Sequence, residues 1–167
     1  MQNNKMKLYH GSNMAIKEPR IIEPNRHLDF GAGFYTTANE EQAMVFAKKV
    51  AERTHMGSPT VSIYEIDWEK VRKNMKVLYF KGPTRAWVDF VAANRSGKNT
   101  NDGYDIIVGP VANDDVFTTV DLLLGGVITW PEAIRRLKVK NLFNQYTFMN
   151  ERAISELTYI GEVGKNG

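Results

Sequence analysis

The sequence predicts an α+β domain built mostly from antiparallel strands. Short segments of strand type are interspersed with amphipathic helical segments, without the regular strand–helix–strand alternation of a parallel sheet. The 167 residues fit one domain, and the 43% that are hydrophobic suffice for a substantial core. We expect a single domain over residues 1–160 and a flexible tail over residues 161–167, as is usual at chain termini.

The first part of the chain predicts a strand, a long irregular segment and a helix. Residues Lys5–His10 form the strand, and residues 13–34 are rich in Pro, Asn and Gly. A loop of that length in a compact domain is usually functional or disordered. The segment TTANEEQAMVFAKKVAERT (36–54) predicts a helix capped by Asn39, with Gln42 as its capping-box partner. The apolar face of this helix consists of Ala43, Phe46, Ala47 and Val50.

The rest of the chain continues the mixture of strands and helices. Strands are predicted in TVSIYEIDW (60–68), MKVLYF (75–80), YDIIVGPV (104–111) and NQYTFMN (144–150). Helices are predicted over Thr84–Asn94, Asp115–Leu124, Pro131–Leu137 and Glu151–Glu156. A capping box formed by Thr129 and Glu132 indicates the start of the helix over Pro131–Leu137.

Composition and charge exclude several functional classes. The chain has no cysteine, and its three histidines lack metal-ligand spacing, so we expect no metal site. The net charge of +3 suits a phosphate-bearing ligand but is far weaker than the basic stripe of a nucleic-acid binder. No segment approaches the roughly 18 apolar residues of a membrane span. The start MQNNKMK lacks the apolar region of a signal peptide, so we expect a cytoplasmic protein, with delivery as an effector as the alternative.

Two glycine-containing motifs stand near the front of the chain. LYHGSN (8–13) places His10 and Gly11 where the predicted first strand ends. LDFGAGFYTT (28–37) contains two glycines followed by Tyr35, immediately before the predicted helix. Glycine allows backbone to approach a ligand closely. Taken singly, LYHGSN is more typical of a strand that ends in a turn, and LDFGAGFYTT of a turn with Tyr35 as a core aromatic.

Together the two motifs resemble the ADP-ribosyltransferase superfamily. The likeness is to its His-Tyr-Glu branch, which includes the poly(ADP-ribose) polymerases and diphtheria toxin, and to a little-characterised bacterial domain family of the same superfamily. It covers residues 7–13 and 29–47, and more loosely 144–149. The resemblance implies an ADP-ribosyltransferase-like domain, in which two mostly antiparallel sheets with flanking helices form a cleft for NAD as co-substrate.

The resemblance also implies roles for individual residues. His10 would hydrogen-bond the ribose next to nicotinamide, and the backbone of Gly11 would bind the nicotinamide amide. Tyr35 would stack on the nicotinamide ring, and Phe46 would supply a second aromatic face, which favours a cationic ring. Helix packing is the alternative explanation for Phe46.

Further contacts to NAD are implied for the long loop. Residues 13–30 would cover the adenosine and the diphosphate, with Arg20 and Arg26 as phosphate partners. Gly33 would let the backbone approach the ligand, and Ser12 would contact the adenosine side. Alternatively, the two arginines are solvated loop cations and Ser12 completes a turn.

The sequence departs from the family pattern at Gln145. The family places a glutamate there, whose charge stabilises the positive ribose formed when the nicotinamide bond breaks. Glutamine can accept a hydrogen bond from a ribose hydroxyl, but it supplies no net charge and cannot act as a base. Another carboxylate, at Asp114, Asp115 or Glu151, is one alternative, and an ordinary polar residue at a strand edge is another.

The leading hypothesis is a mono-ADP-ribosyltransferase that moves ADP-ribose from NAD to an acceptor that is a protein, a nucleic acid or a small molecule. A catalytically silent NAD- or ADP-ribose-binding module is the main rival, since Gln145 replaces the glutamate. A nucleic-acid or protein interaction domain is a weaker alternative. The basic segment RRLKVK (135–140) is typical of a solvated helix face, although it would also attract phosphate groups.

Overall fold

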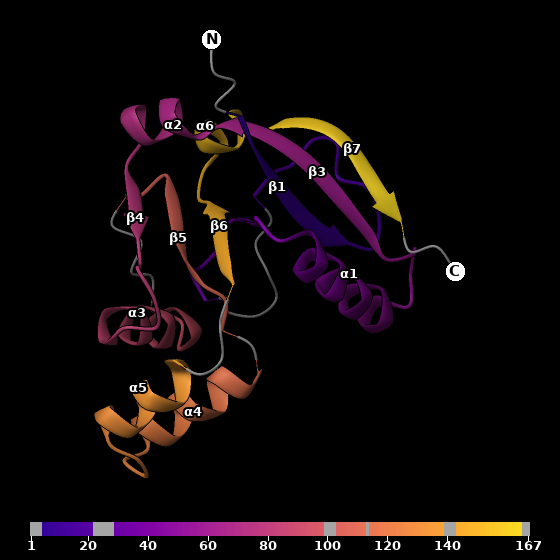
Figure 1. Cartoon of the computed structure of the whole chain (residues 1–167). Coiled ribbons are helices and arrows are strands. Elements are labelled where there is room, and N and C mark those ends of the chain that lie inside the picture. The colour runs from indigo at the N-terminus through magenta and orange to yellow at the C-terminus, as the bar shows by residue number, and fades with distance from the viewer. Residues whose placement is uncertain (1–4, 22–28, 99–102, 113, 139–142, 165–167) are drawn as a thin grey trace.

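The computed structural model describes residues 5–21, 29–98, 103–112, 114–138 and 143–164. They form an α+β domain with one seven-stranded mixed sheet, in the order β4-β5-β6-β2-β1-β3-β7 (Figure 1). The strands are β1 (Lys5–Ser12), β2 (Phe34–Thr37), β3 (Thr60–Asp67), β4 (Val77–Tyr79), β5 (Ile106–Pro110), β6 (Asn144–Phe148) and β7 (Thr158–Gly164). The helices are α1 (Glu40–Thr54), α2 (Trp68–Asn74), α3 (Arg85–Arg95), α4 (Asp114–Leu124), α5 (Trp130–Lys138) and α6 (Glu151–Ile154).

The strand pairing explains how one sheet replaces the two that we expected. Only β4 and β5 pair in parallel, and the other neighbours are antiparallel. β1 pairs with β3 along its whole length, whereas its pairing with β2 consists of the single pair Tyr9 and Thr37. The sheet therefore has a four-stranded part and a three-stranded part that meet at one point. In Figure 1, β4, β5 and β6 lie on one side and β1, β3 and β7 on the other.

Several local predictions are confirmed. Asn39 caps α1, and its side-chain oxygen accepts a 2.8 Å hydrogen bond from the backbone N–H of Gln42. Thr129 accepts a hydrogen bond from the N–H of Glu132 at the start of α5, and the helix predicted over Thr84–Asn94 is α3, which the structure shows capped by Thr84. Trp87 is fully buried, and its indole N–H donates to the backbone oxygen of Pro110.

Three elements were missed. β2 is a four-residue strand where the sequence predicts the end of the irregular segment and the start of the helical segment 36–54, and α2 is a short helix capped by Asp67. The prediction of a flexible tail is wrong for residues 161–164, because β7 continues to Gly164 and pairs with the start of β3. β7 alternates between exposed and half-buried residues, so its sequence carries no buried-strand signal. Its pairing partner, which lies far back in the chain, decides its conformation.

The core lies on both faces of the sheet. Alternate residues of a strand point to opposite faces, and in β5 Ile107 joins one core cluster while Ile106 and Val108 join the other. The first cluster packs beneath α3, α4 and α5, and the second includes residues of α2 and α6. At the end of the first strand, α1 packs on β1 through a smaller cluster that contains Ala43, Ala47 and Val61.

Gly11 is the contact point between β1 and α1. A Cβ at this position would collide with the backbone oxygen of Ala43 and would lie 2.8 Å from the amide nitrogen of Ala47. The missing side chain is therefore explained by the approach of the helix, independently of any ligand. Since His10 directly precedes it, this packing also fixes the position of the candidate histidine.

We expect Gly11→Ala to destabilise the fold by about 2–3 kcal/mol, because overpacking against a helix backbone is not relieved by a rotamer change. Urea denaturation followed by circular dichroism measures the loss. The matched control is Gly82→Ala, since a Cβ at Gly82 would meet nothing within 4 Å. Equal stability of the two variants would show that α1 does not need this close approach.

Candidate functional site

His10 lies where β1 and β2 separate. Its Nδ1 is 2.6 Å from the backbone oxygen of Tyr35, and its ring stacks on Phe34 with ring centres 4.3 Å apart. The hydrogen bond joins the two strands just beyond their single backbone pair, Tyr9 and Thr37. The ring is thus held by one polar and one apolar contact.

This hydrogen bond determines the tautomer of His10. A carbonyl oxygen can only accept, so Nδ1 donates and carries the proton. Burial lowers the pKa of His10 below its ordinary value of 6.5, although the bond to Tyr35 opposes part of that effect. At neutral pH the ring is therefore uncharged, and Nε2 is the acceptor. An accepting Nε2 suits a hydroxyl donor such as a ribose O–H.

Tyr35 is bound tightly within its own loop. Its hydroxyl donates to the backbone oxygen of Gly31 at 2.6 Å and accepts from the N–H of Phe30 at 3.1 Å. Its ring lies against that of Phe30, with centres 6.5 Å apart, and burial raises the pKa of the phenol. The side chain therefore closes the turn over residues 30–35, while its stacking on a ligand stays a prediction.

We expect Tyr35→Phe to lower the free energy of unfolding by about 1–2 kcal/mol, because the N–H of Phe30 and the carbonyl of Gly31 lose a buried partner. Thermal denaturation measures this loss. Tyr79→Phe is the matched control, since Tyr79 is 54% exposed. If nicotinamide-like inhibitors still bind to Tyr35→Phe, the phenol acts in the turn and the ring is free to stack.

Gln145 lies at the start of β6, on the strand that pairs with both β2 and β5. It is buried, and its Nε2 donates to Oδ2 of Asp29 at 3.4 Å. Asp29 is also buried, and its Oδ1 accepts from Nε of Arg95 at 2.7 Å. The N–H of Ala112 donates to Oδ2 of Asp29 at 3.1 Å. Because the amide nitrogen faces this carboxylate, the amide oxygen of Gln145 is directed away from it.

The charge of Asp29 is locally balanced. Arg95 pairs with it, donates to the backbone oxygen of Ala112 and lies 3.5 Å from the ring centre of Phe117. We refer to Asp29, Arg95 and Gln145 as the polar cluster. The cluster links the loop before β2, the end of α3 and the start of β6, and Gln145 joins it through Asp29.

Asp29 was missed by the sequence analysis. Its partners Arg95, Ala112 and Gln145 are 66, 83 and 116 residues away in the chain. No local spacing announces contacts of that range. The available signal was its position inside the second glycine-containing motif, LDFGAGFYTT (28–37).

The structure places the other predicted site residues as follows. Phe46 is 44% exposed, so the expectation that it belongs to the packed face of α1 is wrong, and its ring is accessible. Arg20 is exposed, and the Oγ of Ser12 lies 3.4 Å from Oδ1 of Asn13. At Gly33 a Cβ would lie 2.9 Å from Thr147, so β6 itself requires this glycine.

Of the alternative carboxylates, the described contacts of Asp115 and Glu151 do not include Gln145. Glu151 accepts a bond from the N–H of Ile21, and Asp115 is exposed on α4. Arg26 and the side chain of Asp114 lie outside the residues that the structure describes. Asp29 is therefore the carboxylate that the described contacts place beside Gln145.

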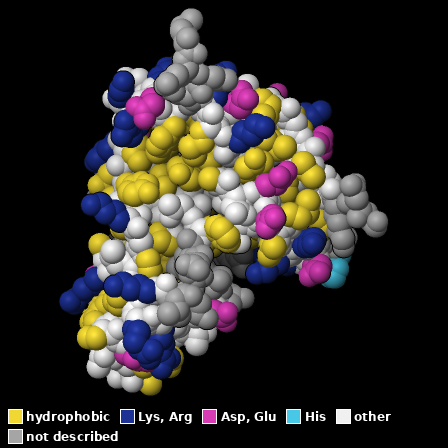
Figure 2. All heavy atoms as spheres, in the orientation of Figure 1, with side chains coloured by type: hydrophobic (Ala, Val, Ile, Leu, Met, Phe, Trp, Pro, Cys, Tyr) yellow, Lys and Arg dark blue, Asp and Glu magenta, His cyan; other side chains and the backbone are white. Residues whose placement is uncertain are grey.

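The basic segment on α5 is partly neutralised. Arg135 and Arg136 both pair with Glu132, at 2.6 and 2.9 Å. Hydrogen bonds from Arg135 and Arg136 lower the pKa of the Glu132 carboxyl to about 2. Figure 2 shows Lys and Arg side chains on the end of the molecule formed by α4 and α5, with acidic side chains among them. This agrees with the interpretation of a solvated helix face.

The described residues lack two further features, a metal-binding cluster and a membrane-spanning helix. They contain no group of three or more His, Cys, Asp or Glu side chains arranged to hold a metal ion. None of the helices in the described part of the chain is both long enough and apolar enough to cross a membrane.

Fold and site define an α+β domain that holds a neutral histidine at the divergence of two strands, with a buried amide bound to a paired carboxylate. The chain belongs to DUF3990, a family described as a protein of unknown function, whose match covers residues 6–159. Comparisons with curated proteins and with solved structures found no match.

Proposed function

We propose that this protein transfers ADP-ribose from NAD to an acceptor, with His10 binding the nicotinamide ribose. The observation that carries the proposal is the hydrogen bond from Nδ1 of His10 to the carbonyl of Tyr35. It fixes the ring so that Nε2 accepts a hydroxyl proton. The resemblance of the two glycine motifs to ADP-ribosyltransferases supports NAD as the substrate, and the accessible ring of Phe46 supports a stacking role.

In the proposed reaction, the bond between the nicotinamide nitrogen and ribose C1′ breaks, and its electron pair leaves with neutral nicotinamide. An acceptor nucleophile forms the new bond to C1′ and loses its proton to solvent or to a base of its own. His10 and the amide oxygen of Gln145 hold ribose hydroxyls while positive charge grows on the sugar. Neutral hydrogen-bond acceptors stabilise that charge less than a carboxylate does, so we infer single transfers rather than polymer formation.

The polar cluster supports an alternative to the transferase, namely a catalytically silent binding module. Asp29 is the carboxylate beside Gln145, but its charge is balanced by Arg95 at 2.7 Å. Such a site can bind NAD or ADP-ribose. It has no net negative charge with which to stabilise the ribose cation. A catalytically silent binding module is therefore the second candidate function.

Direct titration of NAD and ADP-ribose by calorimetry, together with nicotinamide release measured with and without cell lysate, tests the proposal. We expect NAD to bind and nicotinamide to be released, with more release when lysate supplies the acceptor. Binding with no release in either mixture would favour the silent module. An absence of both binding and release would contradict the proposal and favour an interaction domain.

A further inference from the structure

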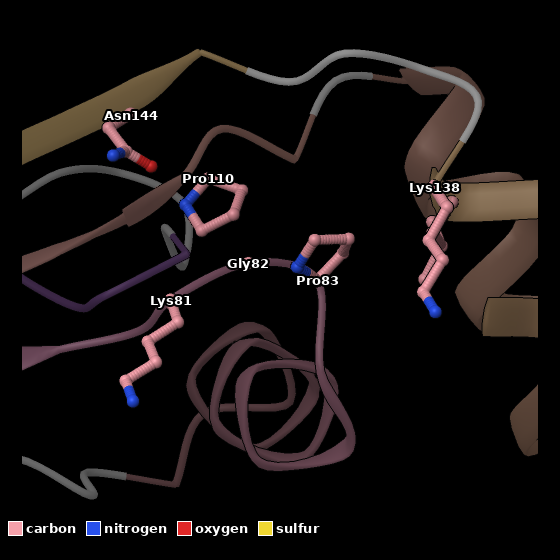
Figure 3. A pocket seen from close by; sticks show the side chains of 7 residues that line it. Lys81, Gly82, Pro83, Pro110, Lys138 and Asn144 are labelled. Carbon is pink, nitrogen blue, oxygen red and sulfur yellow. The ribbon is translucent and has the colours of Figure 1, made fainter.

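A pocket of about 290 Å³ lies beyond the ends of β4 and β5, beside the first residue of β6 (Figure 3). Because β4 and β5 are parallel, their carboxyl ends meet at the same edge of the sheet. The last residue of α5, Lys138, closes another side. The pocket thus lies between elements that are distant in the sequence.

The lining of this pocket is positively charged. Among the described residues that line it, Lys81 and Lys138 carry charge and none is acidic. Within the described part of the chain, no ion pair involves either lysine, whereas Arg135 and Arg136 on the same helix are paired with Glu132. In Figure 3 the two lysine side chains lie on either side of Pro83. Two uncompensated ammonium groups favour an anion with more than one negative charge.

The remaining lining residues indicate the chemistry of the group to which the anion is attached. Pro83, Pro110 and Leu137 supply apolar surface, and Asn144 supplies an amide. At Gly82 an added Cβ would meet nothing within 4 Å, so the backbone is open there. A phosphate ester combines a doubly charged group, suited to lysines, with an organic part that suits the apolar walls.

The pocket is also adjacent to the candidate site. Asn144, which lines it, directly precedes Gln145. Pro110 pairs with Asn144 across the sheet, and Ala112, two residues further along, donates to Asp29 of the polar cluster. A ligand bound in the pocket would therefore lie against the strand ends that position Gln145.

We propose that this pocket binds a phosphate group of a phosphate ester used in the reaction, an inference that rests on the proposed function. The two sources of that group are the diphosphate of NAD and a phosphate carried by the acceptor. In either case Lys81 and Lys138 provide the charge, and the apolar walls contact the organic part.

Inorganic phosphate is the first probe. We expect its addition to ¹⁵N-labelled protein, at constant ionic strength set by chloride, to shift the amide signals of Lys81, Gly82, Lys138 and Asn144 in a saturable way. The double variant Lys81→Gln/Lys138→Gln should bind phosphate roughly tenfold more weakly, because two attractive charges are removed. Lys7→Gln/Lys73→Gln removes the same charge from exposed positions outside the pocket lining and should bind as the wild type does.

A second variant tests the shape of the pocket separately from its charge. Gly82→Leu keeps both lysines but places a side chain at the open glycine, and it should also weaken phosphate binding. The inference is overturned if phosphate does not saturate the wild-type signals. It is equally overturned if the control double variant loses as much affinity as Lys81→Gln/Lys138→Gln.

Adding NAD to the phosphate-bound protein distinguishes the two sources. Displacement of phosphate by NAD, with weaker NAD binding by Lys81→Gln/Lys138→Gln, would assign the pocket to the NAD diphosphate. Simultaneous binding, with NAD affinity unchanged in that variant, would assign it to the acceptor. NAD-dependent nicotinamide release without phosphate binding would overturn this inference alone. Phosphate binding by a protein that does not bind NAD would instead overturn the proposed function.

Discussion

Replacing His10 by alanine is expected to abolish nicotinamide release and to weaken NAD binding. The variant removes Nε2, the acceptor that the Tyr35 carbonyl fixes in place, and leaves the ribose hydroxyl without its partner. Loss of a group that positions a reacting sugar lowers the rate by about a hundredfold or more. Nicotinamide release by purified protein measures the rate, and calorimetric titration measures NAD affinity.

His55→Asn is the matched control for this prediction. His55 is exposed and ends α1 in the left-handed conformation with φ of 54°, which asparagine tolerates well. It should release nicotinamide at the wild-type rate. Undiminished release by His10→Ala would remove His10 from the site.

The state of His10 also predicts a pH dependence. Because burial lowers its pKa below 6.5, the folded protein keeps the ring neutral at pH 6.5, where about half of the unfolded chains carry its proton. NAD binding should therefore be constant above pH 6.5 and fall only below it, when Nε2 becomes protonated. The free energy of unfolding should also fall as the pH drops below about 6.5, because the unfolded chain binds the proton of His10 at a higher pH than the folded protein does. A loss of NAD binding as the pH rises through 6.5 would contradict the neutral tautomer.

Replacing Gln145 by glutamate, the residue typical of the resembled family, is expected to destabilise this protein by about 2–3 kcal/mol at neutral pH, because it buries a second carboxylate with one arginine to balance both. The new carboxylate would replace the amide nitrogen that lies 3.4 Å from Oδ2 of Asp29. Repulsion would raise the pKa of one of the two carboxyls, so the penalty should be smaller at pH 5 than at pH 8. Urea denaturation at both pH values measures the effect.

A second substitution separates the electrostatic cause from a merely steric one. In Asp29→Asn/Gln145→Glu the carboxylate and the amide exchange places, so the total charge around Arg95 is that of the wild type. We expect this double variant to recover most of the lost stability. Gln42→Glu is the control, because glutamate is favourable in the first turn of α1. Stability of Gln145→Glu equal to that of the wild type would show that Asp29 and Gln145 are not electrostatically coupled.

The same double variant also distinguishes the two candidate functions. It places a carboxylate at position 145 without the opposing charge of Asp29. If the wild type releases no nicotinamide and the double variant does, the natural protein is a binding module. If both release it, Gln145 permits transfer, and the carboxylate changes only the rate.

The sequence by itself determined the elements whose signals are local. α1 is indicated by Asn39, Gln42 and apolar residues at helical spacing, and α3 by the helical pattern over Thr84–Asn94. The first strand was likewise predicted, but its end was placed at His10, whereas β1 continues through Gly11 to Ser12 and pairs there with β3. These features depend on neighbours within a few residues, where backbone geometry and side-chain periodicity act directly.

Only the tertiary structure decided which distant residues meet. It placed β7 on β3, joined His10 to the carbonyl of Tyr35 and set Asp29 between Arg95 and Gln145. The sequence suggested that Gly11 lacks a side chain so that a ligand can approach, whereas the described neighbour that requires glycine there is α1. Such contacts follow from the packing of elements that are far apart in the chain, and no local pattern encodes that packing. The candidate histidine was therefore predictable from the sequence, whereas the carboxylate beside Gln145 was not.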